Sequence, residues 1–245
     1  MMQACYAVFL REILILKRRL KRQIAGMAVS PLLYMIAFGY AMGDAVRFDG
    51  HTYLEFLVPG LVAMASMTQS FGIATDINVA RFYWFIFEEF QAAPVSNAAY
   101  VTGEVLAGMT RGLLAVGVIL AIGLGFGVVL DYGPLFWLAI LLNSFVFASL
   151  AVGLAMLVKS HADQSLLTNF VITPMAFLGG TFFPVQRLPE WAGTLVRLLP
   201  LTHASAAIRA TAFGKSPPAP AYGVLLATGA VFFWLALHAV NQARD

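Results

Sequence analysis

Six apolar stretches, each about as long as a lipid bilayer is thick, divide this chain and restrict it to an all-α membrane fold. Crossing the hydrocarbon core takes roughly 20 apolar residues in a helix, and the backbone polar groups of such a segment must be satisfied within it. We treat residues 1–245 as one transmembrane domain. The six predicted spans are residues 24–43, 54–76, 101–127, 135–158, 165–183 and 220–241.

The charge content agrees with a membrane location. Only 11% of the residues are charged and 60% are hydrophobic, whereas a soluble domain carries about 25% charged residues. The net charge of +3 gives no reason to expect a nucleic-acid partner, because the basic residues gather before the first span. Anionic lipid headgroups attract basic residues in that position, so membrane lipid is the expected surrounding.

A basic segment, residues 17–22, sets the orientation. Cytoplasmic loops are rich in Lys and Arg, and the first span usually dominates, so both termini are expected in the cytoplasm. Within residues 4–22, Phe9, Ile13 and Leu16 recur at helical spacing, which predicts an amphipathic helix in the cytoplasmic interface. The alternative is an irregular cytoplasmic start of the first span.

The outer segment 184–219, before the last span, is not a simple loop. Apolar residues recur at helical spacing, but Pro184, Pro189 and Pro200 break the segment into pieces too short to span. We expect short re-entrant or interfacial helices at the outer leaflet. Non-helical backbone survives at membrane depth only where protein or water satisfies it, so this segment is predicted to border a cavity or a partner subunit.

The cytoplasmic segment 77–100, between the second and third spans, carries a candidate contact site. A short helix there would end at Pro94, and the aromatic run at residues 82–87 would leave a large apolar patch exposed. Such patches usually mark a membrane or protein contact, and a docking partner would also explain two adjacent carboxylates. The candidate contact residues are Phe87, Glu88, Glu89, Phe90, Gln91 and Pro94.

Glu104 and Arg111 are ionisable residues of the third predicted span. They lie about two turns apart on one helix face, and charges within spans usually face a bundle interior or water. One interpretation is a charge pair or network at the inner end of the bundle. The other is that Glu104 lies at headgroup level and Arg111 extends towards it.

Signs of chemistry carried by the chain itself are absent from the sequence. Gly214, Lys215 and Ser216 resemble the end of a phosphate-binding loop, but that pattern requires a glycine where Arg209 stands. The four histidines are isolated, and metal-binding spacings are missing. We therefore expect no enzymatic activity, no metal and no cofactor bound by this chain.

Four motifs occur in a fixed order along the chain. Residues 56–61 read Phe-Leu-Val-Pro-Gly-Leu, residues 88–95 hold the paired glutamates, and residues 103–112 end in Arg-Gly. The outer signature comprises residues 178–184, 188–189, 199–203 and 208–209. With these motifs the whole chain resembles a type-2 ABC exporter permease, in particular the short bacterial permeases that include nodulation lipo-oligosaccharide exporters and candidate drug exporters.

This resemblance implies a permease subunit of the bacterial cytoplasmic (inner) membrane. Two copies would pair with two separate ATPase subunits, which would bind ATP and magnesium. The segment around Glu88 would be the coupling helix, and residues 4–22 the connecting helix. Relatives commonly have polar or glycine residues where residues 84–87 are Trp-Phe-Ile-Phe, so the coupling helix would start later here or contact its partner differently.

Two helix faces are candidates for the path of an amphipathic, lipid-linked or drug-like substrate moved out of the cytoplasm or inner leaflet. Both faces mix apolar and hydroxyl side chains at helical spacing, and Met and aromatic surfaces adapt to greasy ligands. The alternative is ordinary helix packing across a dimer interface. The residues are Met64, Met67, Thr68 and Phe71 in the second span and Thr173, Phe177 and Thr181 in the fifth.

Two other functions stay open at this point. A non-transport membrane scaffold would have the same composition. A secondary transporter is less favoured, since such carriers often show inverted repeats and acidic groups at mid-membrane, whereas the charges of this chain lie near the ends of the predicted spans.

Overall fold

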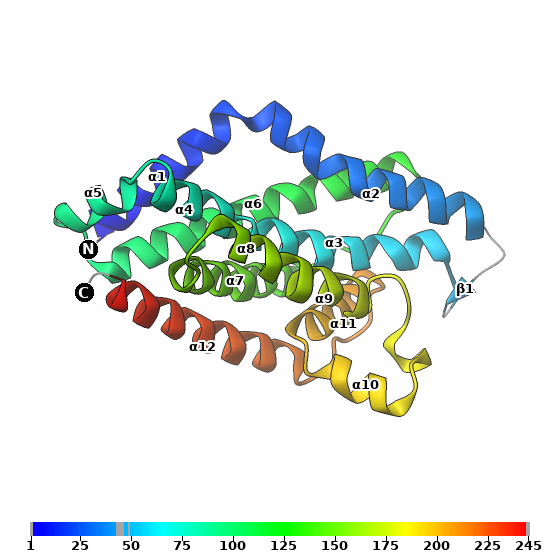
Figure 1. The fold of residues 1–245 in the computed structure, drawn as a ribbon. Coiled ribbons are helices and arrows are strands. Elements are labelled where there is room, and N and C mark those ends of the chain that lie inside the picture. Colours follow the sequence, from blue (N-terminus) through cyan, green and yellow to red (C-terminus); the bar gives the residue numbers. More distant parts are fainter. Residues whose placement is uncertain (1, 43–46, 49, 244–245) are drawn as a thin grey trace.

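The computed structural model describes residues 2–42, 47–48 and 50–243 and shows an elongated helical bundle (Figure 1). Helices that are long and apolar enough to cross a membrane number four in the described part of the chain. They are Tyr53–Phe82, made of α3 (Tyr53–Phe71) and α4 (Ile73–Phe82), together with α6 (Asn97–Gly125), α7 (Pro134–Leu157) and α12 (Ala221–Gln242).

Helix α7 forms the centre of the bundle and packs against α3, α4, α6, α11 and α12. Its sequence is apolar on every side, as expected for a helix surrounded by others. Phe136 and Phe147, both fully buried, are among the largest side chains of the core. The long helices begin at clear signals, such as the Thr52–Glu55 capping box of α3 and Ser96, which caps α6.

The N-terminal part forms two helices, α1 (Met2–Arg18) and α2 (Leu20–Met42), with a bend at Arg19. The predicted separate helix over residues 4–22 therefore exists but ends earlier. Val8 of α1 lies against Gly103 of α6, where an added Cβ would come within 2.8 Å of the valine side chain. That α1 lies in the interface and that α2 crosses the membrane, as the span at residues 24–43 requires, stay predictions.

The boundaries of the second and third spans differ from the expected ones. The helical run through α3 and α4 continues to Phe82, beyond the expected end at residue 76, and α6 begins at Asn97 rather than 101. The intervening segment is thus shorter than expected and contains helix α5 (Ile86–Ala92). Before α3, Arg47–Phe48 (β1) and His51–Thr52 (β2) pair as a small antiparallel hairpin. Residues 43–46 and 49, where the first predicted span ends and the loop after it begins, lie outside the described residues.

The fifth predicted span is divided into three pieces. They are α8 (His161–Leu167), a π-helical turn η1 (Thr168–Ile172) and α9 (Thr173–Leu178). Thr173 donates its hydroxyl to the carbonyl of Thr168 at 3.2 Å, and Pro174 has no backbone N–H to donate. These features explain the change of helix type within residues 165–183. A crossing by this segment stays a prediction.

The outer segment 184–219 contains short helices, as expected. They are the 3₁₀ turn η2 (Val185–Arg187), α10 (Glu190–Arg197) and α11 (Pro200–Ala212). Each follows or begins at one of the prolines, whose fixed φ favours the first helical position. Helix α11 packs against α3, α7 and α12, whereas Trp191 and Leu198, in and just after α10, stay exposed. Their depth in a membrane stays a prediction.

Candidate functional site

The candidate contact helix α5 lies at the end of the bundle where α1 and α12 lead to the two termini (Figure 1). The chain enters it through Phe85, whose φ of +54° is in the left-handed region that residues other than glycine rarely adopt. Tyr83, Trp84 and Phe85 are all exposed, with Trp84 half accessible at 50%. The helix ends at Ala92, before Pro94, as predicted.

The inner side of α5 is fixed by an aromatic cluster. The Tyr100 ring of α6 contacts Phe87, at 5.6 Å between centroids, and Phe90, at 5.3 Å. The guanidinium of Arg11 from α1 lies 4.9 Å from the Phe90 ring, and that of Arg81 from α4 lies 5.6 Å from the Phe87 ring. Contacts of this kind are worth ~0.5–1.5 kcal/mol each. Helices α1, α4 and α6 therefore meet at α5.

The other candidate contact residues divide between exposed and undescribed. Glu89 and Pro94 are exposed. The side chains of Glu88 and Gln91 lie outside the described part of the structure. Phe87 and Phe90 face the bundle, because both rings contact Tyr100. Glu89 and the aromatic run 83–85 are exposed and form the surface that a partner would meet.

Glu104 and Arg111 do not pair with each other, so the predicted pair between them is wrong. Each has a partner on another helix. Arg111 forms an ion pair with Asp76 of α4. Glu104 is fully buried, 3.8 Å from Arg11, which also pairs with the adjacent Glu12. Glu104 and Arg111 are separated by about 10 Å along α6, and each meets a closer group on another helix.

The surroundings of Arg11 favour its charged form. Burial opposes this charge, but Glu12 and Glu104 more than offset that effect, so the pKa of Arg11 is raised. Because Arg11 also stacks on Phe90, one side chain connects α1 with both α5 and α6.

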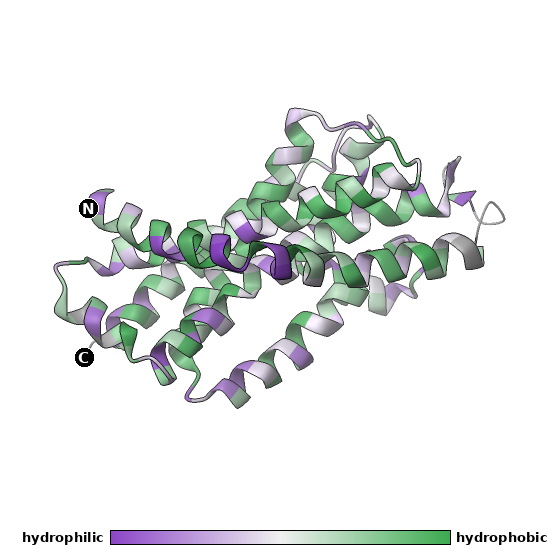
Figure 2. Cartoon of the chain, turned by 90° about the horizontal axis from the view of Figure 1, so that it is seen from above, coloured by the Kyte–Doolittle hydropathy of each residue, from purple (hydrophilic) through white to green (hydrophobic). Residues whose placement is uncertain are grey.

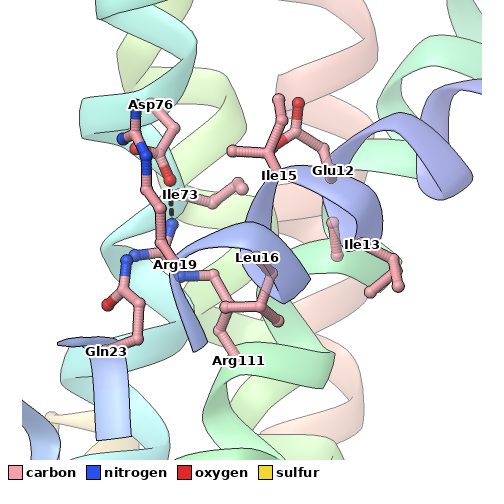
Figure 3. Close-up of a pocket in the computed structure, with 10 residues that line it drawn as sticks. Glu12, Ile13, Ile15, Leu16, Arg19, Gln23, Ile73, Asp76 and Arg111 are labelled. Atoms are coloured by element: carbon pink, nitrogen blue, oxygen red, sulfur yellow. Dashed lines mark hydrogen bonds and ion pairs between the residues drawn. The ribbon is translucent and has the colours of Figure 1, made fainter. Parts of the chain in front are cut away.

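A small cavity lies between the bend of α1 and α2 and the adjoining faces of α4 and α6 (Figure 3). Its polar lining is Glu12, Arg19, Gln23, Asp76 and Arg111, and Ile13, Leu16 and Ile73 are among its apolar residues. The Nε of Arg111 is buried without a hydrogen-bond partner among the described residues.

At the opposite end, the outer motifs of the sequence meet around Arg209 of α11. Its Nη2 donates to the carbonyls of Gly180 (2.8 Å) and Thr181 (3.4 Å), and its Nε donates to that of Phe56 (3.3 Å). The guanidinium lies 3.9 Å from the Phe56 ring. Gly60 and Gly180 permit this packing, since a Cβ on Gly60 would lie 2.3 Å from the Thr181 carbonyl oxygen and Gly180 has a φ of +81°.

The candidate pathway residues do not form one continuous surface in a single copy of the chain. Met64, Met67 and Phe71 of α3 are buried, while Thr68 is partly accessible. Thr173 and Phe177 are exposed. Thr181 is buried and donates its hydroxyl to the carbonyl of Ala176.

Sequence reasoning missed three residues of these sites. Tyr100 stands at the end of the predicted cytoplasmic segment 77–100 and Arg11 in the predicted amphipathic helix 4–22, but no spacing rule connects either residue with α5. Arg209 was noted as part of a motif, but its hydrogen bonds to two distant segments depend on the tertiary fold. Groups of three or more His, Cys, Asp or Glu side chains able to hold a metal were not found in the described residues.

Comparison with known proteins relates the chain to membrane transporters. The model of the family described as "ABC-2 type transporter" matches residues 3–213. The inner membrane transport permease YadH of Escherichia coli (strain K12) is 28% identical over 221 residues, which cover 88% of this chain and 86% of that protein. Nodulation protein J of Rhizobium meliloti (strain 1021) is 33% identical over 222 residues, covering 85% and 81%. Nodulation protein J of Rhizobium leguminosarum bv. viciae is 30% identical over a similar range.

Proposed function

Because the chain belongs to the ABC-2 type transporter family, we propose that it is the membrane permease subunit of an ATP-driven exporter of the bacterial inner membrane. Proteins similar to it include an inner membrane transport permease. In the proposed assembly two copies pair with two separate ATPase subunits, which bind ATP and magnesium and perform the hydrolysis. Both termini and α5 face the cytoplasm.

The observation that carries this proposal is the two-sided character of α5. The face of α5 that points away from the bundle presents Glu89 beside the exposed Tyr83, Trp84 and Phe85. An aromatic patch this accessible, at the end of the bundle, favours a protein partner, and a carboxylate at its edge favours a basic group on that partner.

The face of α5 that packs against the bundle supports a coupling role. Phe87 and Phe90 pack on Tyr100 of α6, and Arg11 connects Phe90 with Glu104. Close-packed interiors transmit displacement rather than absorb it. A movement imposed on α5 would therefore reach α1 and α6.

The proposed substrate is amphipathic, lipid-linked or drug-like. Phe177 and Thr173 place a mixed apolar and hydroxyl surface on the outside of a single copy, where a second copy or a substrate can meet it. The partly accessible Thr68 adds a hydroxyl on α3. Direction of transport is outward in this proposal, by the resemblance of the motifs to exporters.

Charge reversal on α5 tests the proposal. The double variant Glu88→Lys and Glu89→Lys should reduce binding of the cognate ATPase and transport, because two positive charges would face its basic groups. The matched control is Glu190→Lys, which reverses an exposed glutamate in α10, far from α5 (Figure 1). Permease expression and melting temperature check folding. Wild-type assembly and transport in the double variant would remove α5 from the contact.

A further inference from the structure

The bend between α1 and α2 concentrates positive charge. Five basic side chains occupy six consecutive positions, and all five are exposed. In the described part of the chain, none of them has a carboxylate within ion-pair distance. Like charges one helical turn apart repel, so a negatively charged ligand at this bend would relieve an existing repulsion. The residues are Lys17, Arg18, Arg19, Lys21 and Arg22.

The length of α2 is compatible with a bend at a membrane surface. Helix α2 has 23 residues and is therefore about 34 Å long, close to the roughly 30 Å of the hydrocarbon core. If α2 crosses as the proposed function requires, its first turn lies at the headgroups of the inner leaflet. Figure 2 shows the hydrophilic stretch at the bend between the apolar stretches of α1 and α2.

Exposed apolar side chains precede and follow the bend along the chain. Leu10 and Leu14 of α1 and Ile24 and Val29 of α2 are all exposed large hydrophobic residues. A single patch thus combines positive charge at its middle with apolar surface on both sides. This pattern suits a lipid, whose phosphate is charged and whose acyl chains are apolar, better than a water-soluble anion.

The cavity beneath the bend offers hydrogen-bond donors to a phosphate. Arg19 and Gln23 line it on the side of the bend, and Arg111 lines it from α6. The Nε of Arg111 is buried and has no hydrogen-bond partner among the described residues. The two carboxylates in the lining do not leave a free negative charge, because Asp76 pairs with Arg111 and Glu12 with Arg11. In Figure 3 the side chains of Arg19 and Arg111 enter this space from the bend and from α6.

We propose that the bend and the cavity beneath it form a binding site for an anionic phospholipid of the inner leaflet. Arg19 and Gln23 hold the phosphate, Lys17, Lys21 and Arg22 attract it, and the acyl chains lie along the exposed apolar side chains of α1 and α2. The site rests on the proposed orientation of the chain in the membrane. A lipid bound here connects α1 to α4 and α6, so it also stabilises the helix that carries Arg11.

Lipid binding to the purified full-length chain in detergent tests this site without any ATPase. The probe is fluorescent phosphatidylglycerol, with phosphatidylcholine and inorganic phosphate as competitors. The variants are Arg19→Gln with Gln23→Leu at the cavity, and Lys17→Gln with Lys21→Gln and Arg22→Gln at the bend. The matched control is Arg197→Gln, which removes an exposed arginine of α10.

The expected result is a preference for phosphatidylglycerol over phosphatidylcholine that falls at least about tenfold in both sets of variants and is unchanged in Arg197→Gln. The bend variants should melt near the wild-type temperature, because the altered residues are exposed. Such a melting temperature would exclude misfolding as the cause of weaker binding. Unchanged binding in the cavity variant would overturn the site. Competition by inorganic phosphate at the affinity of the lipid would overturn the choice of lipid as ligand. Either of these two results would leave the proposed dependence of transport on an ATPase unaffected, because no ATPase takes part in the binding assay.

Discussion

Replacing Gly60 with alanine adds a methyl group where α3 touches the loop after α9. The added Cβ would lie 2.3 Å from the Thr181 carbonyl oxygen and 2.9 Å from Nη2 of Arg209. The Thr181 carbonyl would have to retreat by about 1 Å to reach an ordinary contact. That oxygen belongs to the backbone, so no side-chain rotation can relieve the clash.

The expected cost follows from two losses and one gain. Overpacking of a close contact costs ~1–3 kcal/mol. Moving the loop also weakens the hydrogen bonds from Arg209 to Gly180 and Thr181, and bonds from charged donors are worth ~1.5–3 kcal/mol. Alanine regains about 1 kcal/mol of helix propensity. Together these terms predict a loss of about 2–4 kcal/mol.

The assay is thermal unfolding of the purified chain in detergent, with Gly117→Ala as control. Gly117 lies inside α6 with open space around its Cβ position, so the same substitution there should be neutral or slightly stabilising. Gly60→Ala should melt roughly 5–15 °C below wild type. A melting temperature at or above that of Gly117→Ala would refute the packing of the outer motifs on α3.

Two further predictions concern topology and pathway. In a Cys5→Ser background, a cysteine at Lys215 should react with an impermeant thiol reagent from outside and one at Asp163 should not, although both positions are exposed; the reverse pattern would invert the proposed orientation. Thr173→Trp and Thr68→Trp should each impair transport by at least several-fold while assembly and ATPase binding persist, because a large ring would obstruct the proposed pathway; wild-type transport in both would place the pathway elsewhere.

Hydrophobic length and turn residues were sufficient to predict most of the long helices. The expected ranges 135–158 and 220–241 nearly coincide with α7 and α12, because Pro134 is the first residue of α7, Pro220 directly precedes α12, and mainly apolar residues follow each. The short helix before Pro94 was also predicted correctly, since proline disfavours helix in the residue before it.

The change of helix type within residues 165–183 was not predictable from hydropathy. The π turn at Thr168–Ile172 depends on which carbonyls the local N–H and hydroxyl groups select, and apolar content is the same in either case. Pro174 was the available signal, because a proline in a helix removes one donor.

The charged residues show a second limit of sequence reasoning. Periodicity placed Glu104 and Arg111 on one face of a helix, but their partners come from other helices, Arg11 of α1 and Asp76 of α4. A spacing rule describes one helix, whereas an ion pair depends on how helices are arranged. The same reason explains why Tyr100 was not recognised as the anchor of α5.

The most direct test of the central claim is ATP hydrolysis by the purified chain with and without its cognate ATPase. The chain alone should show no hydrolysis, and the chain with its ATPase should form a stable complex that hydrolyses ATP and moves an amphipathic substrate in vesicles. Hydrolysis by the chain that persists after stringent removal of ATPases would contradict the claim. Transport by the chain in the absence of any ATPase subunit would contradict it equally.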